Sequence, residues 1–385
     1  MIVVIADDLT GAAELGGLGL RHGLTVEIVT DIDKPSSKDL LVIATDTRSM
    51  PQQEALAVMA GLTAKLTSLK PGLIYKKVDS VLRGHVIAEL NVHLKGLGLK
   101  RAVLVSANPG FGRTIADGQY FIHGQPIHLT SFANDPEFAI TSPSIYDMLR
   151  ANSSDIHLQT ADKDLPATGI IAGECINDHD LVLWAKKADK ETLMAGGAGL
   201  FNALLGSLNL NLKPIVRPGD NNIKLNQPSL FICGSTFDKS KNLVKQAQNN
   251  NHPVSYMPAD IVKLASPPES LFEDWADEVA SLINLHQKAI VAINDDTIIG
   301  PAPVGLREKM ARVVEKVFQK VVIRELFIEG GSTAAAIIKQ LNFSQFYPVN
   351  EFSMGVIRMK VENKDDLFLT LKPGSYGWPE GTWSF

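Results

Sequence analysis

The fold is decided by a stretch near the start of the sequence, Ile2-Val3-Val4-Ile5-Ala6-Asp7-Asp8-Leu9-Thr10-Gly11. Its apolar residues, 2–6, predict a buried strand, and a helical pattern near 12–22 follows the polar turn. The same succession of apolar run, polar or Gly-rich turn and helix recurs along the chain. The further apolar runs are 26–30, 40–44, 73–75, 102–105, 229–233, 289–293, 325–328 and 368–371. Strands that alternate with helices predict an α/β protein in which mostly parallel sheets are flanked by helices.

This succession is interrupted between residues 213 and 228. The segment is rich in Pro, Asn and Gly and has weak hydrophobic periodicity, so we interpret it as a linker. The sequence therefore predicts two domains, 1–212 and 229–385, and an active site in the cleft between them. A chain of 385 residues is long enough for each domain to bury its own core.

Composition argues against several classes of partner. The formal net charge is −5 and no basic run occurs, so neither a nucleic acid nor a membrane is expected as a partner. No apolar run is long enough to span a bilayer, and the residues after Met1 predict a strand instead of a signal peptide. Cys175 and Cys233 lie far apart without metal-ligand spacing. We therefore expect no disulfide framework and no Cys-based zinc site, and a reducing cytoplasm fits the sequence.

Charged residues collect where the strands of the first half are predicted to end. In open α/β sheets, ligands bind beyond the carboxyl ends of the strands. Arg can grip a carboxylate with two parallel hydrogen bonds, and Asp accepts hydrogen bonds from hydroxyls. These side chains therefore suit a small, anionic, hydroxylated ligand. The candidates are Asp7, Asp8, Arg48, Lys76, Lys77, Asp79 and Arg83.

The adjacent acids Asp7 and Asp8 are expected to have different roles. Neighbouring residues that leave a strand point in different directions, so one carboxylate can face the ligand while the other caps the helix that begins near Gly11. We assign Asp8 to the ligand.

The second half of the sequence contains candidate phosphate-binding turns. Gly330-Gly331-Ser332-Thr333 falls between a predicted strand and a predicted helix, and Gly234-Ser235-Thr236 occupies a similar position. Glycines let backbone N–H groups approach a phosphate, and the positive end of a helix favours an anion. Neither turn is a Walker A loop, and no dinucleotide fingerprint follows the first strand. A plain loop followed by a helix cap would explain either turn alone.

Taken together, the motifs resemble those of a known family, the four-carbon acid sugar kinases, which include D-threonate, D-erythronate and 3-oxo-tetronate kinases. The resemblance runs in order along nearly the whole chain, although many members carry Asp where this chain has Ser332. The motifs are Ile5-Ala6-Asp7-Asp8-Leu9-Thr10-Gly11-Ala12, Thr45-Asp46-Thr47-Arg48, Lys76-Lys77-Val78-Asp79-Ser80-Val81-Leu82-Arg83-Gly84-His85, Ala107-Asn108-Pro109-Gly110-Phe111-Gly112-Arg113-Thr114, Gly234-Ser235, Gly330-Gly331-Ser332-Thr333-Ala334 and Lys372-Pro373-Gly374-Ser375-Tyr376-Gly377.

The resemblance implies an acid-sugar domain followed by a nucleotide domain. By motif position it implies contacts to the sugar acid from Asp8, Arg48, Lys77, Val78, Asp79 and Ser80. It implies contacts to ATP from Ser235, Gly330, Gly331, Ser332, Thr333 and Gly374.

We expect a kinase that transfers the γ-phosphoryl group of ATP to a terminal hydroxyl of the acid, with Mg²⁺ bridging the phosphates and few protein ligands on the metal. Arg48 or Lys77 would grip the carboxylate of the acid, and Asp8 or Asp79 would orient the hydroxyl or accept its proton.

Two other functions stay open at this stage. One is a non-catalytic sensor that binds a sugar acid and a nucleotide. The other is a sugar-phosphate hydrolase or isomerase that uses Asp7 and Asp8. The sequence also leaves open which four-carbon acid is bound and whether the protein is a homodimer.

Overall fold

The computed structural model describes residues 1–32, 36–135, 138–208, 210, 212–215, 224–234, 238–294, 305–374, 376–379 and 381–382, without the side chains of Asn134 and Asp238. The chain divides into two compact units, Met1–Lys213 and Pro214–Phe385, which we call the first and second units. The predicted linker falls at this division, and its residues 216–223 lie outside the described part of the chain.

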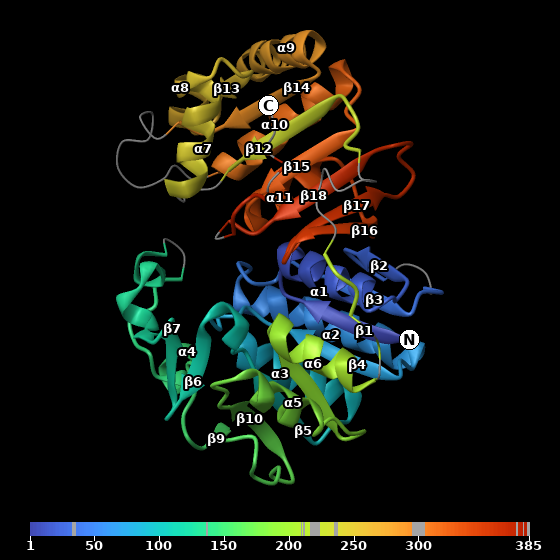
Figure 1. Ribbon diagram of the computed structural model, residues 1–385, viewed down its shortest axis with the longest axis vertical. Coiled ribbons are helices and arrows are strands. Elements are labelled where there is room, and N and C mark those ends of the chain that lie inside the picture. The colour runs from blue at the N-terminus through green and yellow to red at the C-terminus, as the bar shows by residue number, and fades with distance from the viewer. Residues whose placement is uncertain are drawn as a thin grey trace. The chain divides into compact units, whose positions relative to one another are not determined.

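The first unit is built on a parallel sheet of eight strands whose order is β2-β3-β1-β4-β11-β5-β10-β9 (Figure 1). The strands are β1 Ile2–Ala6, β2 Val26–Val29, β3 Leu40–Ala44, β4 Leu73–Lys77, β5 Arg101–Val105, β9 Ile156–Gln159, β10 Gly169–Gly173 and β11 Thr192–Gly196. The helices are α1 Leu9–Arg21, α2 Gln52–Leu69, α3 Val86–Leu97, α4 Ile145–Leu149, α5 Asp178–Ala185 and α6 Ala198–Ser207.

The apolar runs of these strands form the core of the first unit. Val3 and Ile5 of β1 point to one face of the sheet, because successive side chains of a strand alternate between its faces. There they pack with Leu41 and Ile43 of β3 and with Met59 and Leu66 of α2. Val3, Ile5 and Met59 are fully buried. Burial on both faces explains why these strands read as continuous apolar runs and not as alternating ones.

The order of strands places a topological switch point between β1 and β4. The chain leaves β1 through α1 toward β2 on one side, and it leaves β4 through α3 toward β5 on the other side. Connections that depart in opposite directions open a crevice at the carboxyl ends of the two strands. The residues that follow Ala6 and Lys77 are therefore in the position where such sheets bind ligands.

A small antiparallel sheet lies in the connection between β5 and β9. It consists of β6 Arg113–Ala116, β7 Gln119–Ile122 and β8 Gln125–Pro126, and it pairs with itself and not with the large sheet. Short 3-10 helices flank it at Pro109–Phe111, Ile127–Leu129 and Ser131–Asn134. None of these short elements is among those predicted from the sequence.

The second unit has the strand order β13-β14-β12-β15-β18-β17-β16. Neighbours from β13 to β18 are parallel, and β17 is antiparallel to both β18 and β16. The strands are β12 Ser229–Cys233, β13 Val254–Tyr256, β14 Lys288–Ala292, β15 Glu325–Glu329, β16 Gln345–Ser353, β17 Val356–Val361 and β18 Phe368–Lys372. The helices are α7 Asp238–Asn249, α8 Ala259–Lys263, α9 Glu269–His286, α10 Leu306–Lys320 and α11 Gly331–Gln340.

The second unit repeats the topological arrangement of the first. The connection from β12 runs through α7 toward β13, and the connection from β15 runs through α11 toward β16, on the opposite side. A switch point therefore lies between β12 and β15, next to Gly234 and Gly330. Phe231 and Phe327 stack beneath it, with ring centroids 4.3 Å apart.

The predicted α/β class with mostly parallel sheets and flanking helices is confirmed. The individual elements differ in several places from those predicted, and β9, β10, β11, β13, β16 and β17 are not among the predicted strands. Helix α1 begins at Leu9, earlier than expected, and Lys76 and Lys77 belong to strand β4 instead of following it. Among the described residues, no helix is both long and apolar enough to cross a membrane.

Candidate active site

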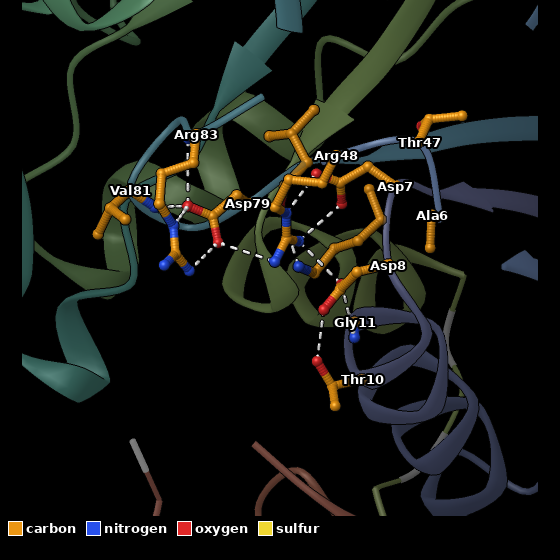
Figure 2. A network of polar contacts seen from close by, with 12 residues as sticks. Ala6, Asp7, Asp8, Thr10, Gly11, Thr47, Arg48, Asp79, Val81 and Arg83 are labelled. Carbon is orange, nitrogen blue, oxygen red and sulfur yellow. Dashed lines mark hydrogen bonds and ion pairs between the residues drawn. The ribbon is translucent and has the colours of Figure 1, made fainter. Parts of the chain in front are cut away.

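The guanidinium of Arg48 lies among three carboxylates at the carboxyl ends of β1, β3 and β4 (Figure 2). Its Nε and Nη2 donate to the two oxygens of Asp7, each at 2.9 Å, as a bidentate pair. Nη2 also lies 2.8 Å from Asp8 Oδ1, and Nη1 lies 3.5 Å from Asp79 Oδ1. The side chain of Arg48 is only 15% exposed. One cation therefore holds together acids that come from two different strands.

Asp8 is the N-cap of α1. Its Oδ1 accepts a hydrogen bond from Gly11 N at 2.9 Å, and its Oδ2 accepts one from Thr10 Oγ1 at 2.5 Å. A Cβ atom at Gly11 would lie 2.6 Å from Asp8 Oδ1 and 3.1 Å from Lys77 Nζ, so any other residue there would push the Asp8 carboxylate out of its position. The expectation that the acid not assigned to the ligand caps the helix is corrected here, because Asp8 itself is the cap. The assignment of Asp8 to the ligand stays a prediction.

Asp79 is the centre of a second set of contacts. Its Oδ2 accepts from the backbone N–H groups of Val81 and Arg83, each at 3.2 Å. The Arg83 guanidinium binds the same carboxylate through Nε and Nη2, both at 2.8 Å. The remaining nitrogen, Nη1, donates to Asp135 Oδ2 at 2.7 Å. The charge of Arg83 is therefore fully engaged with carboxylates of its own unit.

The buried carboxylates differ in their acidity. Burial raises the pKa of Asp7 above its ordinary value, although Arg48 opposes the shift. Burial alone would also raise the pKa of Asp8, but Arg48 and Lys77 attract the charged form and lower it. In Asp79 the effect of burial is outweighed by Arg83 and Arg48, which hold its pKa far below the usual range. Asp8 and Asp79 are therefore ionised at neutral pH.

Adjacent lysines of β4 point to opposite faces of the sheet. Lys77 points toward the switch point, where its Nζ donates to Val78 O at 2.9 Å and lies 3.9 Å from Glu14 Oε2. Lys76 points away, is fully buried and pairs with Glu89 at 2.6 Å. Of the two sequence candidates, only Lys77 is therefore placed at the site.

Ser80 connects the site to the small antiparallel sheet. Its hydroxyl accepts a hydrogen bond from Arg113 Nη1, and its carbonyl oxygen accepts one from Tyr120 Oη at 2.6 Å. Phe132 lies against both Arg83 and Arg113, with each guanidinium carbon 5.9 Å from the ring centroid. Sequence reasoning placed Ser80 and Arg83 among the candidates but assigned no role to Arg113 or Phe132.

The glycine turns of the second unit meet at its own switch point. Gly330 has φ 94° and ψ 131°, a conformation that favours glycine, and α11 begins at the next residue without a side-chain cap. A Cβ atom at Gly234 would lie 2.3 Å from Thr333 Oγ1, which shows how closely the two turns approach. Gly374 follows β18, the strand next to β15. Ser235 lies outside the described residues.

A buried ion pair lies directly behind these turns. Glu329 and Lys372 are the last residues of neighbouring strands, and their side chains are each 1% exposed. Lys372 Nζ lies 3.1 Å from Glu329 Oε1 and donates to Tyr376 O at 2.6 Å. Ser240 and Trp378 donate to the carboxylate of Glu329, the latter at 3.1 Å. This cluster fixes the strand ends from which the glycine turns depart.

The chain matches two family descriptions in succession. Residues 2–204 match the sugar-binding N-terminal domain, and residues 230–381 match the nucleotide-binding C-terminal domain. A D-threonate kinase of Salmonella typhimurium is 26% identical over 98% of this chain and 95% of its own length. This protein belongs to the four-carbon acid sugar kinase family. The resemblance seen in the sequence motifs is thereby confirmed.

Other relatives agree with this membership. A D-erythronate kinase of Heliobacterium modesticaldum is 34% identical over 40% of the chain and 36% of its own length. A 3-oxo-tetronate kinase of Actinobacillus succinogenes is 22% identical over 98% of the chain and 97% of its own length. The crystal structure of a Salmonella typhimurium protein shares the fold with a TM-score of 0.78, at 18% identity and with 99% and 97% of the two chains covered. The family consists of phosphotransferases, and this chain is an enzyme of that kind.

Proposed function

We propose that this enzyme transfers the γ-phosphoryl group of ATP to a terminal hydroxyl of a four-carbon sugar acid, which is threonate, erythronate or 3-oxo-tetronate. The observation that carries the proposal is the pair of switch points. Ionised carboxylates and cations lie at the switch point of the first unit. Glycine turns at the start of a helix lie at the switch point of the second unit. The names of the relatives supply the substrate class.

The acid site comprises Asp8, Arg48, Lys77, Val78, Asp79, Ser80 and Arg83. In the proposed reaction Asp8 accepts a hydrogen bond from the substrate hydroxyl and holds it in line with the γ-phosphorus. Arg48 keeps Asp8 and Asp79 in place and ionised, because its guanidinium contacts both carboxylates.

The proposed step needs little basicity from the protein. The hydroxyl oxygen bonds to the γ-phosphorus, the bond from that phosphorus to the β,γ-bridging oxygen breaks, and ADP leaves. In a loose transition state the attacking hydroxyl keeps most of its proton until late. A carboxylate with a lowered pKa, such as Asp8, can then receive the proton once the new bond has formed. Asp79 is the other carboxylate in reach of this role.

For the nucleotide we propose contacts from Ser235, Gly330, Gly331, Ser332, Thr333 and Gly374. The N-terminus of α11 offers backbone N–H groups and a positive dipole end to the phosphates. Mg²⁺ would arrive with the nucleotide and neutralise the phosphate charge. Mg²⁺ usually keeps several waters and binds substrate phosphates, so we propose that few protein ligands hold it here.

A coupled ADP-release assay against stereoisomers of the three acids tests the proposal. We expect ADP formation that depends on one of the acids and on Mg²⁺. The assay without an acid measures ATP hydrolysis. A sugar phosphate incubated with the protein without ATP, and analysed for released phosphate or a new isomer, tests for a hydrolase or an isomerase. Binding of an acid and of ATP without any ADP release would contradict the proposal and favour a non-catalytic sensor.

A further inference from the structure

We infer that Arg113 is the residue that binds the carboxylate of the acid and makes the enzyme select an acid over its neutral analogue. The inference rests on the proposed function and assigns one end of the substrate to one side chain. The sequence offers Arg48 and Lys77 for this role, and the geometry points away from both.

Arg113 is distinguished from the other site arginines by its contact partners. Arg48 contacts three carboxylates, and Arg83 contacts the carboxylates of Asp79 and Asp135. An anion that used either guanidinium would first have to displace a buried carboxylate and leave it without its counter-ion. Among the described residues, the Arg113 guanidinium donates one hydrogen bond, from Nη1 to the neutral hydroxyl of Ser80. Its other N–H groups can therefore meet an incoming anion without breaking an ion pair.

Lys77 is less suited to capture the carboxylate. Its side chain is 5% exposed, its ammonium donates to Val78 O, and its charge helps to keep Asp8 ionised. Arg113 is half-buried, so solvent and a ligand can reach it. The planar guanidinium also matches the two oxygens of a carboxylate, which an ammonium cannot do.

The backbone of Arg113 is fixed before any ligand binds. Asn108 and Arg113 exchange two backbone hydrogen bonds, of 2.9 and 3.1 Å, and thereby close a tight loop after β5. Strand β6 begins at Arg113 and pairs with β7, while Phe132 packs against the guanidinium. The loop extends from the carboxyl end of a strand in the same sheet as β1 and β4. Ser80, its hydrogen-bond partner, directly follows Asp79 in the chain.

These contacts suggest how the substrate is oriented. Its carboxylate binds at Arg113 and Ser80, and its hydroxyls extend along Asp79 toward Asp8. A four-carbon acid carries its carboxylate and its terminal hydroxyl at opposite ends. A cation at one end and a carboxylate at the other therefore fix which hydroxyl is presented for transfer.

The test compares an acid with its uncharged isostere in the intact protein. We would measure kcat/KM for the acid identified by the ADP-release assay and for its amide, in wild type and in Arg113→Met. The variant should lower kcat/KM for the acid by roughly 10²-fold, because a charge-assisted pair is lost. The value for the amide should change by less than about 3-fold, and KM for ATP should stay constant, because neither depends on the carboxylate. The preference for acid over amide should therefore collapse.

A matched variant controls for the loss of a positive charge. Arg101→Met also removes a guanidinium, but at the first residue of β5, whereas Arg113 follows the end of that strand. Arg101 pairs with Asp189, and its substitution should leave the preference for the acid unchanged. Arg113→Lys keeps the charge without the forked geometry and should fall between wild type and Arg113→Met.

Any of three results would overturn the inference. If Arg113→Met lowers kcat/KM equally for acid and amide, Arg113 acts on the phosphate or on the fold. If kcat/KM for the acid stays at its wild-type value in Arg113→Met, the carboxylate belongs to Arg48 or Lys77. If wild type forms no ADP with any acid, the proposed function fails, and calorimetric titration with threonate then tests Arg113 without turnover. Equal threonate affinity of wild type and Arg113→Met would reject the inference there as well.

Discussion

Substitution of Arg48 by Met is expected to destabilise the first unit, and by an amount that depends on pH. Met keeps much of the aliphatic volume and removes the guanidinium. Asp7 is the acid most affected, because both of its oxygens pair with Arg48 and its side chain is only 6% exposed. Asp8 keeps its contacts to Thr10 and Gly11, and Asp79 keeps its contacts to Arg83.

The size of the stability loss can be estimated because Arg48→Met removes one member of a buried ion pair. Removal of one member of a buried ion pair costs about 3–5 kcal/mol, because the other charge is left without compensation. For a unit of this size, that cost corresponds to a fall in melting temperature of roughly 6–20 °C. The double variant Asp7→Asn/Arg48→Met removes the uncompensated charge as well and should recover part of the loss.

The destabilisation caused by Arg48→Met should depend on pH, because the pKa values of Asp7, Asp8 and Asp79 are shifted in the folded protein. The pKa of Asp7 is already raised by burial, and without Arg48 it rises further. The folded variant then takes up a proton more readily than the unfolded chain, so acidification relieves its destabilisation. Asp8 and Asp79 have lowered pKa values in the wild type, which loses their stabilisation as the pH falls below their ordinary values. Both effects make the difference between wild type and variant smaller at lower pH.

Calorimetric melts of wild type, Arg48→Met and the double variant between about pH 3 and pH 8 would measure these differences, because the ordinary pKa of Asp is 3.8. A stability loss below about 1 kcal/mol, as found for exposed pairs, would refute the interpretation of Arg48 as the buried counter-ion. A stability loss of Arg48→Met that grows as the pH is lowered would refute the same interpretation.

Three further predictions concern the two switch points. Asp8→Asn should lower kcat by roughly 10²–10⁴-fold with little effect on ATP affinity; a stability loss of about 1 kcal/mol with unchanged steady-state kinetics would reduce Asp8 to a helix cap. Gly331→Val should weaken ATP binding in a folded protein, because a β-branched side chain occupies the approach to the backbone; calorimetry that shows wild-type affinity would make the turn only a helix start. Lys372→Met should destabilise the second unit by about 3–5 kcal/mol, with partial recovery in Glu329→Gln/Lys372→Met; additive losses in thermal melts would disprove their pairing.

The strands with continuous apolar runs could be predicted from the sequence, whereas β9, β10, β11, β13, β16 and β17 were not among the predicted runs. The apolar runs at 40–44 and 229–233 coincide with β3 and β12, since strands covered on both faces need apolar side chains throughout. The helix after β1 was placed too late, because Asp8 caps it and its first residues, Leu9 and Thr10, read as a turn. The small sheet β6–β8 was missed because its strands have at most four residues, too few for a clear periodicity.

The site was predictable in its location but not in its pairings. The rule that ligands bind at the carboxyl ends of strands placed Asp8 and Asp79 at one crevice. It could not show that Arg48 pairs with Asp7, 41 positions away, because that contact depends on how β1 and β3 lie side by side. For the same reason, two adjacent lysines looked equivalent in the sequence, although only Lys77 faces the site.

The separate sheet β6–β8 has a consequence for how such an enzyme could acquire new acceptors. The acids and Arg48 sit on loops fixed by the parallel sheet, where one change disturbs several neighbours. Arg113 comes instead from an insertion between β5 and β9, whose strands pair with one another and not with the strands of the large sheet. Residues of β6–β8 can therefore vary without altering the register of any long strand. A library directed at this insertion, with the turn after β1 left intact, is the economical route to a kinase for acceptors with a different anionic group or none.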